Sequence, residues 1–149
     1  MDKRLVCARI CSHLEKSKDE SIRQLQSLKQ SLLSESKSSA GDKHETARAM
    51  IHQEMRQVND TLVRAERALQ EVNQIGESKV SPVRVASGVL VETDGPWVLV
   101  GVALNRIDMR EGHVYGVSSE APLAKAWHGA EVGDVKSLGP NQLTIVALH

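Results

Sequence analysis

A short polar stretch near residue 40 carries the side chains best suited to chemistry in this chain. Residues 37–48 read KSSAGDKHETAR, in which Asp42 and Glu45 are three apart and His44 lies between them. Paired carboxylates supply the oxygen ligands that a hard cation such as Mg²⁺ takes. The same two acids also fit a capping box, with Asp42 as the N-cap of a helix and Glu45 three residues on, which makes a structural role the simpler interpretation.

The remaining charged residues of this stretch have plainer interpretations. Lys37 and Lys43 could contact phosphates or an acidic protein surface, although exposed lysines at a turn are usually only solvated. An imidazole such as His44 can exchange a proton near neutral pH, but the sequence fixes no carboxylate beside it, so we interpret it as an exposed residue. Arg48 is expected to anchor the stretch by pairing with Glu45 or Glu35.

Two heptad segments flank the polar stretch and would position it. Their apolar residues recur at spacings of three and four, and in the first segment Lys18 and Ser21 fill two seam positions. The seams comprise Cys7, Cys11, Leu14, Leu25, Leu28 and Leu32, then Ile51, Met55, Val58, Leu62, Ala65, Leu69 and Val72. This pattern predicts an antiparallel coiled-coil hairpin over residues 1–75 with its tip at about 36–45. Each helix of about 30 residues would be about 45 Å long.

The two cysteines lie four residues apart on the core face of the first segment. We interpret Cys7 and Cys11 as buried free thiols, because a disulfide would be unusual in a reducing cytosol. A zinc site would need two further ligands, which His13 alone cannot supply. No metal site is therefore expected in the isolated protein.

A second domain is predicted after the hairpin. Gly76 and Pro82 indicate that the second helix stops near residue 75 and that residues 76–82 form a linker. Within residues 83–149, apolar patterns predict strands at 83–91, 97–103, 113–117 and 143–148, and a short helix at 121–128. Turn sequences at 93–96 and 138–141 contain Gly and Pro. The expected class is α+β, a helical hairpin followed by a small antiparallel sheet with one helix.

Composition narrows the classes of function. The 149 residues include 19 basic and 19 acidic side chains, and this zero formal charge gives no support to a protein that wraps nucleic acid. No apolar run reaches the roughly 18 residues that a membrane span needs, and the N-terminal sequence lacks the apolar stretch of a signal peptide. We therefore expect a cytoplasmic protein with a protein partner.

The predicted architecture and one motif carry a resemblance. Residues 121–134 read APLAKAWHGAEVGD, and this string after a helical hairpin resembles the Gre transcription factors of bacterial RNA polymerase. Seven residues match the motif of that family: Pro122, Leu123, Lys125, Ala126, Gly129, Gly133 and Asp134. Ala121 replaces a serine, and Trp127 and His128 replace two aliphatic residues.

The resemblance implies a fold, a partner and a mode of action. Gre factors bind the polymerase through an FKBP-like C-terminal domain and insert the coiled coil into the secondary channel, where acidic tip residues help to hold a catalytic Mg²⁺. It therefore implies RNA polymerase as partner, indirect contact with RNA and DNA, a Mg²⁺ shared with the polymerase and no active site or cofactor of its own. The polymerase-facing candidates are Pro122, Leu123, Lys125 and Trp127. The simplest interpretation of Trp127, as of Trp97, is nevertheless a core or half-buried residue.

The chain departs from the cleavage factors at the tip. When their Tyr-x-x-Ala-Arg string is aligned with residues 44–48, Lys37 and Ala40 stand where the two acids belong. Three interpretations stay open: a Gre-like regulator of elongation that does not stimulate cleavage, a cleavage stimulator that uses Asp42 and Glu45, and a coiled-coil module unrelated to polymerase. We favour the first, as a monomer whose hairpin satisfies its own seam.

Overall fold

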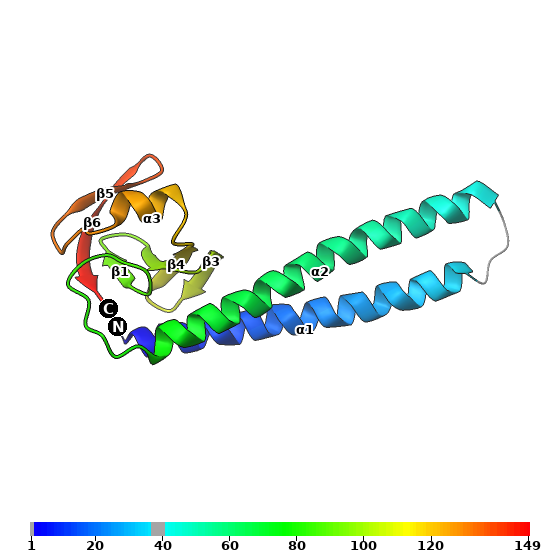
Figure 1. The fold of residues 1–149 in the computed structure, drawn as a ribbon, viewed down its shortest axis with the longest axis horizontal. Coiled ribbons are helices and arrows are strands. Elements are labelled where there is room, and N and C mark those ends of the chain that lie inside the picture. Colours follow the sequence, from blue (N-terminus) through cyan, green and yellow to red (C-terminus); the bar gives the residue numbers. More distant parts are fainter. Residues whose placement is uncertain (1, 37–40) are drawn as a thin grey trace. The chain divides into compact units, whose positions relative to one another are not determined.

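Two long helices open the fold. The computed structural model describes residues 2–36 and 41–149, with Ser36 and Asp42 described by their backbone alone. Helix α1 spans Lys3–Ser36 and helix α2 spans Gly41–Glu77 (Figure 1). Contacts divide the chain into two units. The sheet unit contains the chain up to Cys11 and from Gln70 onward, and the hairpin unit is Ser12–Leu69.

The predicted heptad seam is confirmed. Every predicted seam residue of both helices is buried or half-buried, including Lys18 and the polar Ser21, which is only 6% exposed. Hydrogen bonds fix the antiparallel register within the hairpin unit, where the amide of Gln24 donates to the carboxylate of Glu54 at 3.3 Å. The rest of each helix surface is largely exposed and charged, so the buried seam is what selects this pairing.

The sheet has six strands in the order β3-β4-β2-β1-β6-β5. The strands are β1 Leu90–Thr93, β2 Trp97–Val100, β3 Leu104–Met109, β4 Gly112–Val117, β5 Val135–Leu138 and β6 Asn141–Leu148, and helix α3 is Pro122–Trp127. The α+β class is confirmed. The sheet is mixed rather than wholly antiparallel, because β2 and β4 pair in parallel while the other four pairings are antiparallel.

Apolar residues are buried on both faces of the central strands. On one face, Val91 and Val98 pack in a cluster with Ala124, Trp127 and Ile145, of which Ala124 and Trp127 belong to α3. Leu90 and Leu99, which alternate with these residues along the strands, are 0% exposed on the opposite face. A sheet that buries apolar residues on both faces must have other parts of the protein packed against both faces.

The bases of the two long helices belong to the sheet unit. Val6, Ile10 and Val72 are at most 1% exposed, and a side chain at Gly101 would lie 3.5 Å from Cδ1 of Ile75. The predicted boundary, with the hairpin ending at residue 75 and a linker at 76–82, is therefore corrected. Helix α2 continues to Glu77, and its last turns contribute to the core of the sheet unit.

The predicted strand at 83–91 is correct only at its end. Residues before Leu90 make isolated loop hydrogen bonds instead, such as Val85 N–H to the carbonyl of Ala130 at 2.8 Å and Gly88 N–H to the carbonyl of Val100 at 2.7 Å. Gly88 has a φ of +85°, which interrupts an extended ladder. The other three predicted strands and the short helix are present, and both predicted turns join strands.

No helix among residues 2–36 and 41–149 is both long enough and apolar enough to cross a bilayer.

Candidate functional site

The tip is the first of two predicted sites, and the structure describes most of it. Lys37 lies outside the described residues. Asp42 lies in the first turn of α2, but its side chain is also outside them, so its predicted capping bond stays a prediction. Lys43 and Glu45 are exposed on the same turn. Glu45 is thus reachable by a partner or by a metal ion that a partner holds.

His44 is paired with a carboxylate that sequence reasoning did not place beside it. Its Nδ1 lies 2.7 Å from Oε2 of Glu35, with the two side chains 29% and 32% exposed. The interpretation of His44 as an isolated exposed residue is therefore wrong. The signal for this pair was in the heptad pattern, because Glu35 lies three residues after Leu32 and His44 lies seven before Ile51.

Arg48 completes a polar layer with these two residues. Its Nη2 donates to the backbone carbonyl of Glu35 at 3.5 Å, whereas the predicted partner was a carboxylate of Glu35 or Glu45. Its Nε is buried and has no hydrogen-bond partner within the part of the chain that the structure describes. We call Glu35, His44 and Arg48 the tip layer.

The tip layer ends an otherwise mostly apolar seam with charge. The hydrogen bond between His44 and Glu35 joins the last turn of α1 to the first turn of α2. Pairs near the protein surface contribute only about 0.2–1 kcal/mol to stability. The tip layer therefore contributes little to the stability of the hairpin. Its main effects are to orient the tip and to place polar groups there.

Helix α3 carries the second predicted site. It begins with Pro122 directly after Ala121, whose extended backbone (φ −62°, ψ 143°) makes no side-chain cap. Proline suits the first helical position because its missing N–H would have no intrahelical partner there. Pro122 is exposed, and so is Lys125, whose Nζ lies 3.1 Å from Oε2 of Glu120.

Trp127 faces the core and not a partner. Its side chain is 1% exposed, and its indole N–H donates to the backbone carbonyl of Ser137 at 3.0 Å. This confirms the simpler of the two interpretations of Trp127, a core residue, and removes its ring from the candidate polymerase-facing surface. Leu123 is half-buried and packs against the same core cluster, so only part of it is available for contact. Pro122 and Lys125 are the accessible members of the predicted set.

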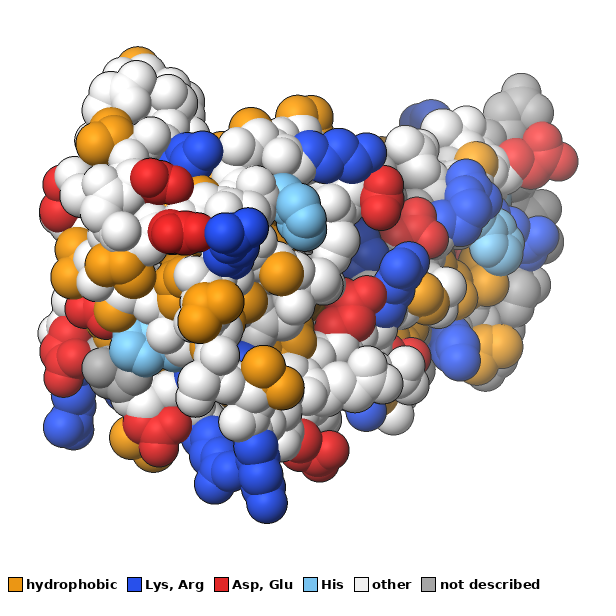
Figure 2. Space-filling model, turned by 60° about the vertical axis from the view of Figure 1, so that its left-hand side comes forward, with side chains coloured by type: hydrophobic (Ala, Val, Ile, Leu, Met, Phe, Trp, Pro, Cys, Tyr) orange, Lys and Arg blue, Asp and Glu red, His pale blue; other side chains and the backbone are white. Residues whose placement is uncertain are grey.

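The candidate surfaces offer no built metal site of their own in the described part of the chain. On the face shown in Figure 2, basic and acidic side chains are interspersed with apolar ones. Among the described residues, no group of three or more His, Cys, Asp or Glu side chains is placed to hold a metal ion. A Mg²⁺ ion at the tip would need further ligands from a partner.

Comparisons with protein-family models, with curated proteins and with solved structures found no match for this chain.

Proposed function

We propose that this chain is a Gre-like transcription factor that acts in the cytoplasm. It binds bacterial RNA polymerase through its sheet unit and inserts the hairpin into the secondary channel to modulate elongation. It has no catalytic activity of its own. The observation that carries the proposal is the hairpin of two helices of 34 and 37 residues, whose seam runs to a polar tip layer.

The hairpin suits a task that requires a slender element with a polar end. Helices of this length span about 50 Å at 1.5 Å per residue. The seam residues of the two helices are buried or half-buried, although Leu33, Met50 and Val63 outside the seam are exposed, so the seam itself needs no second chain to cover it. Glu45 and Lys43 are exposed at the end where the resemblance places contact with the polymerase active site.

The surface of α3 suits docking. Of the residues that match the Gre motif, Leu123 is half-buried and packs against the core cluster, while Pro122 and Lys125 are exposed. A rigid helix anchored by Trp127 presents these side chains at little cost in conformational entropy. The sharpest variant at this surface is Lys125→Glu, because Leu123→Asp would also disturb the core.

The test combines polymerase binding with transcript cleavage in the same samples. Purified protein is added to core RNA polymerase and to a stalled, backtracked elongation complex, and binding and RNA shortening are both recorded. We expect binding without cleavage, and at least about tenfold weaker binding for Lys125→Glu, which corresponds to about 1.4 kcal/mol. Arg110→Glu is the matched control, since it makes the same charge change at an exposed position in the β3–β4 turn.

Two other outcomes would each contradict a part of the proposal. If RNA shortening occurs and is lost with Glu45→Gln, the chain is instead a cleavage stimulator. If neither wild type nor Arg110→Glu binds the polymerase, the proposal fails and a general coiled-coil module remains.

A further inference from the structure

A cleft lies between the bases of the two long helices, within the sheet unit. It has a volume of about 540 Å³ and is lined from α1 by Arg4, Cys7, Ala8 and Cys11, and from α2 and the residues after it by Val72, Asn73, Gly76, Glu77 and Lys79. This volume lies in the range of small-ligand sites. Both cysteines of the chain line this one cleft.

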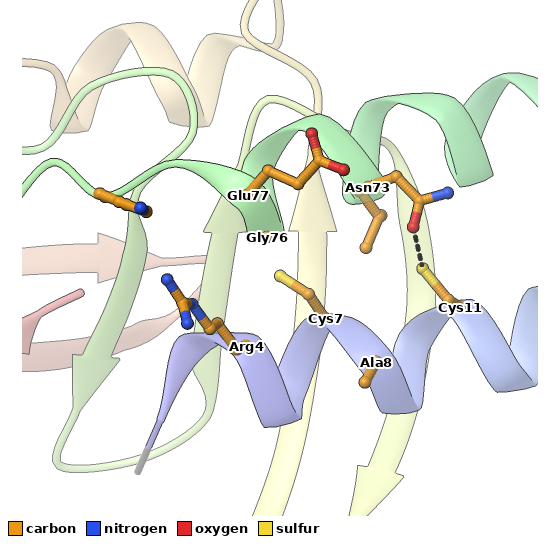
Figure 3. Close-up of a pocket in the computed structure, with 9 residues that line it drawn as sticks. Arg4, Cys7, Ala8, Cys11, Asn73, Gly76 and Glu77 are labelled. Atoms are coloured by element: carbon orange, nitrogen blue, oxygen red, sulfur yellow. Dashed lines mark hydrogen bonds between the residues drawn. The ribbon is translucent and has the colours of Figure 1, made fainter.

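The two thiols are held on the same side of α1. Figure 3 shows Cys7 and Cys11 one turn apart, with both sulfur atoms on the side of α1 that faces α2. The Cys11 thiol donates to Oδ1 of Asn73 at 3.3 Å. Neither cysteine forms a disulfide. Two sulfur donors at spacing i, i+4 are neighbours on a helix surface.

Gly76 explains how Cys7 fits between the helices. A β-carbon at Gly76 would lie 3.1 Å from Cβ of Cys7, so the absence of a side chain there lets α2 approach the cysteine closely. This close approach, and not helix termination, is the role of a glycine that the sequence suggested as a stop signal. The Cys7 side chain is 3% exposed, yet it borders an open cleft through which a small ion can reach it.

The side chains that line the cleft determine which kind of metal ion it could bind. The described residues offer no third His, Cys, Asp or Glu for a closed site, which does not fit the four-ligand geometry of structural zinc. Soft thiolates favour soft cations such as Cu(I). Two thiolates around a monovalent cation carry a net charge of −1, and the cleft is lined by two cations, Arg4 and Lys79, against one anion, Glu77.

We propose that Cys7 and Cys11 form a two-thiolate site for a soft, two-coordinate cation of the Cu(I) class at the base of the hairpin. Each thiol gives up its proton as its sulfur bonds to the ion, and no electron is transferred. The site forms when the Cys7 side chain turns toward Cys11, which lies one turn further along the same helix. This proposal is independent of polymerase binding. It differs from the prediction of no metal site in the isolated protein, because that prediction counted the ligands that zinc needs and considered no other metal.

Protons compete with the ion at this site. Because the ligands bind as thiolates, metal affinity must rise with pH. The affinity is therefore expected to increase from pH 6 to pH 8.

The test is an anaerobic titration of the full-length protein with Cu(I) buffered by bicinchoninate, with Ag(I) as a second probe that does not change oxidation state. We expect one ion per chain, an ultraviolet thiolate-to-metal band, and a higher unfolding temperature. Cys7→Ser and Cys11→Ser should each lower the affinity by on the order of 10²–10⁴-fold, because two linked donors bind far more tightly than one.

A matched control separates this site from binding to any thiol. The double variant Cys11→Ser/Ser12→Cys keeps two cysteines but moves one to an exposed position off the seam. It should lose affinity as Cys11→Ser does. Equal affinity of the wild type and this variant would overturn the proposal, and so would a stoichiometry of two. Cys11 is only half-buried, so far-UV circular dichroism should confirm that its variants keep the fold.

Discussion

Replacing Trp127 tests the assignment of this residue to the core. Its ring is the largest fully buried side chain among the described residues, at 1% exposure. Trp127→Ala should destabilise the sheet unit by about 3–5 kcal/mol, which is the usual cost of deleting a buried aromatic ring. Trp127→Phe keeps a buried ring but leaves the carbonyl of Ser137 without its indole donor. That change should cost about 1–2 kcal/mol.

The assay is equilibrium unfolding in urea, followed by the fluorescence of the tryptophan that each variant keeps, which is Trp127 in Trp97→Phe and Trp97 in the two Trp127 variants. This residue lies on β2 of the same unit, and it is the only other tryptophan of the chain. Trp97→Phe, at a half-buried position, is the control and should cost less than Trp127→Ala. A loss within about 0.5 kcal/mol for Trp127→Ala, as at a surface position, would refute the core assignment and restore Trp127 as a docking candidate.

Three further predictions concern packing and ionisation. Ser21→Ala should stabilise the hairpin by about 0.5 kcal/mol, measured by thermal unfolding, because alanine has the higher helix propensity and Ser21 is buried in an apolar seam; a lower unfolding temperature would contradict this. Gly116→Ala should destabilise the sheet unit by about 1–3 kcal/mol in urea, because the new β-carbon would lie 2.6 Å from Cβ of Leu104; unchanged stability would show that β3 can shift. The free energy of unfolding should fall as the pH rises from 9 toward 11, because the pKa of the Cys7 thiol is near 9.0 in the unfolded chain but is raised by burial to about 11 in the folded protein. Cys7→Ala should remove this part of the pH dependence. An unchanged pH profile in that variant would show that other groups cause it.

The hairpin could be predicted from the sequence because its seam follows one simple period. Every predicted seam position is buried or half-buried, even where a lysine or a serine occupies it. The prediction stopped one layer too early at the tip, since Glu35 and His44 continue the heptads with charged side chains. Polar residues at seam positions are easily assigned to the surface when only apolar spacing is counted.

The sheet was harder to predict because its outer strands lack a clear apolar signal. Strands β3 and β5 were missed, and both are edges of the sheet. β3 reads LNRIDM and β5 reads VKSL, with charged or polar residues that natural sheets place at their edges to prevent aggregation. The parallel pairing of β2 with β4 depends on contacts between distant segments, which local patterns do not encode.

The candidate docking residues show the same limit. The motif that suggested Pro122, Leu123, Lys125 and Trp127 gives their order along a helix but not the face that each occupies. A six-residue helix has fewer than two turns, so its periodicity is too short to separate buried from exposed positions. Tertiary packing put Trp127 in the core and left Pro122 and Lys125 outside.

The position of β6 bears on how the chain folds during synthesis. β6 lies between β1 and β5 in the sheet, although it leaves the ribosome after the other five strands of this sheet. The hairpin unit is complete by Leu69, so its helices can pair while the later strands are still being translated. Until residues 141–148 emerge, Val91 and Thr93 lack their β6 partners and β1 is an open apolar edge. The nascent protein therefore passes through a stage in which a chaperone could hold that edge.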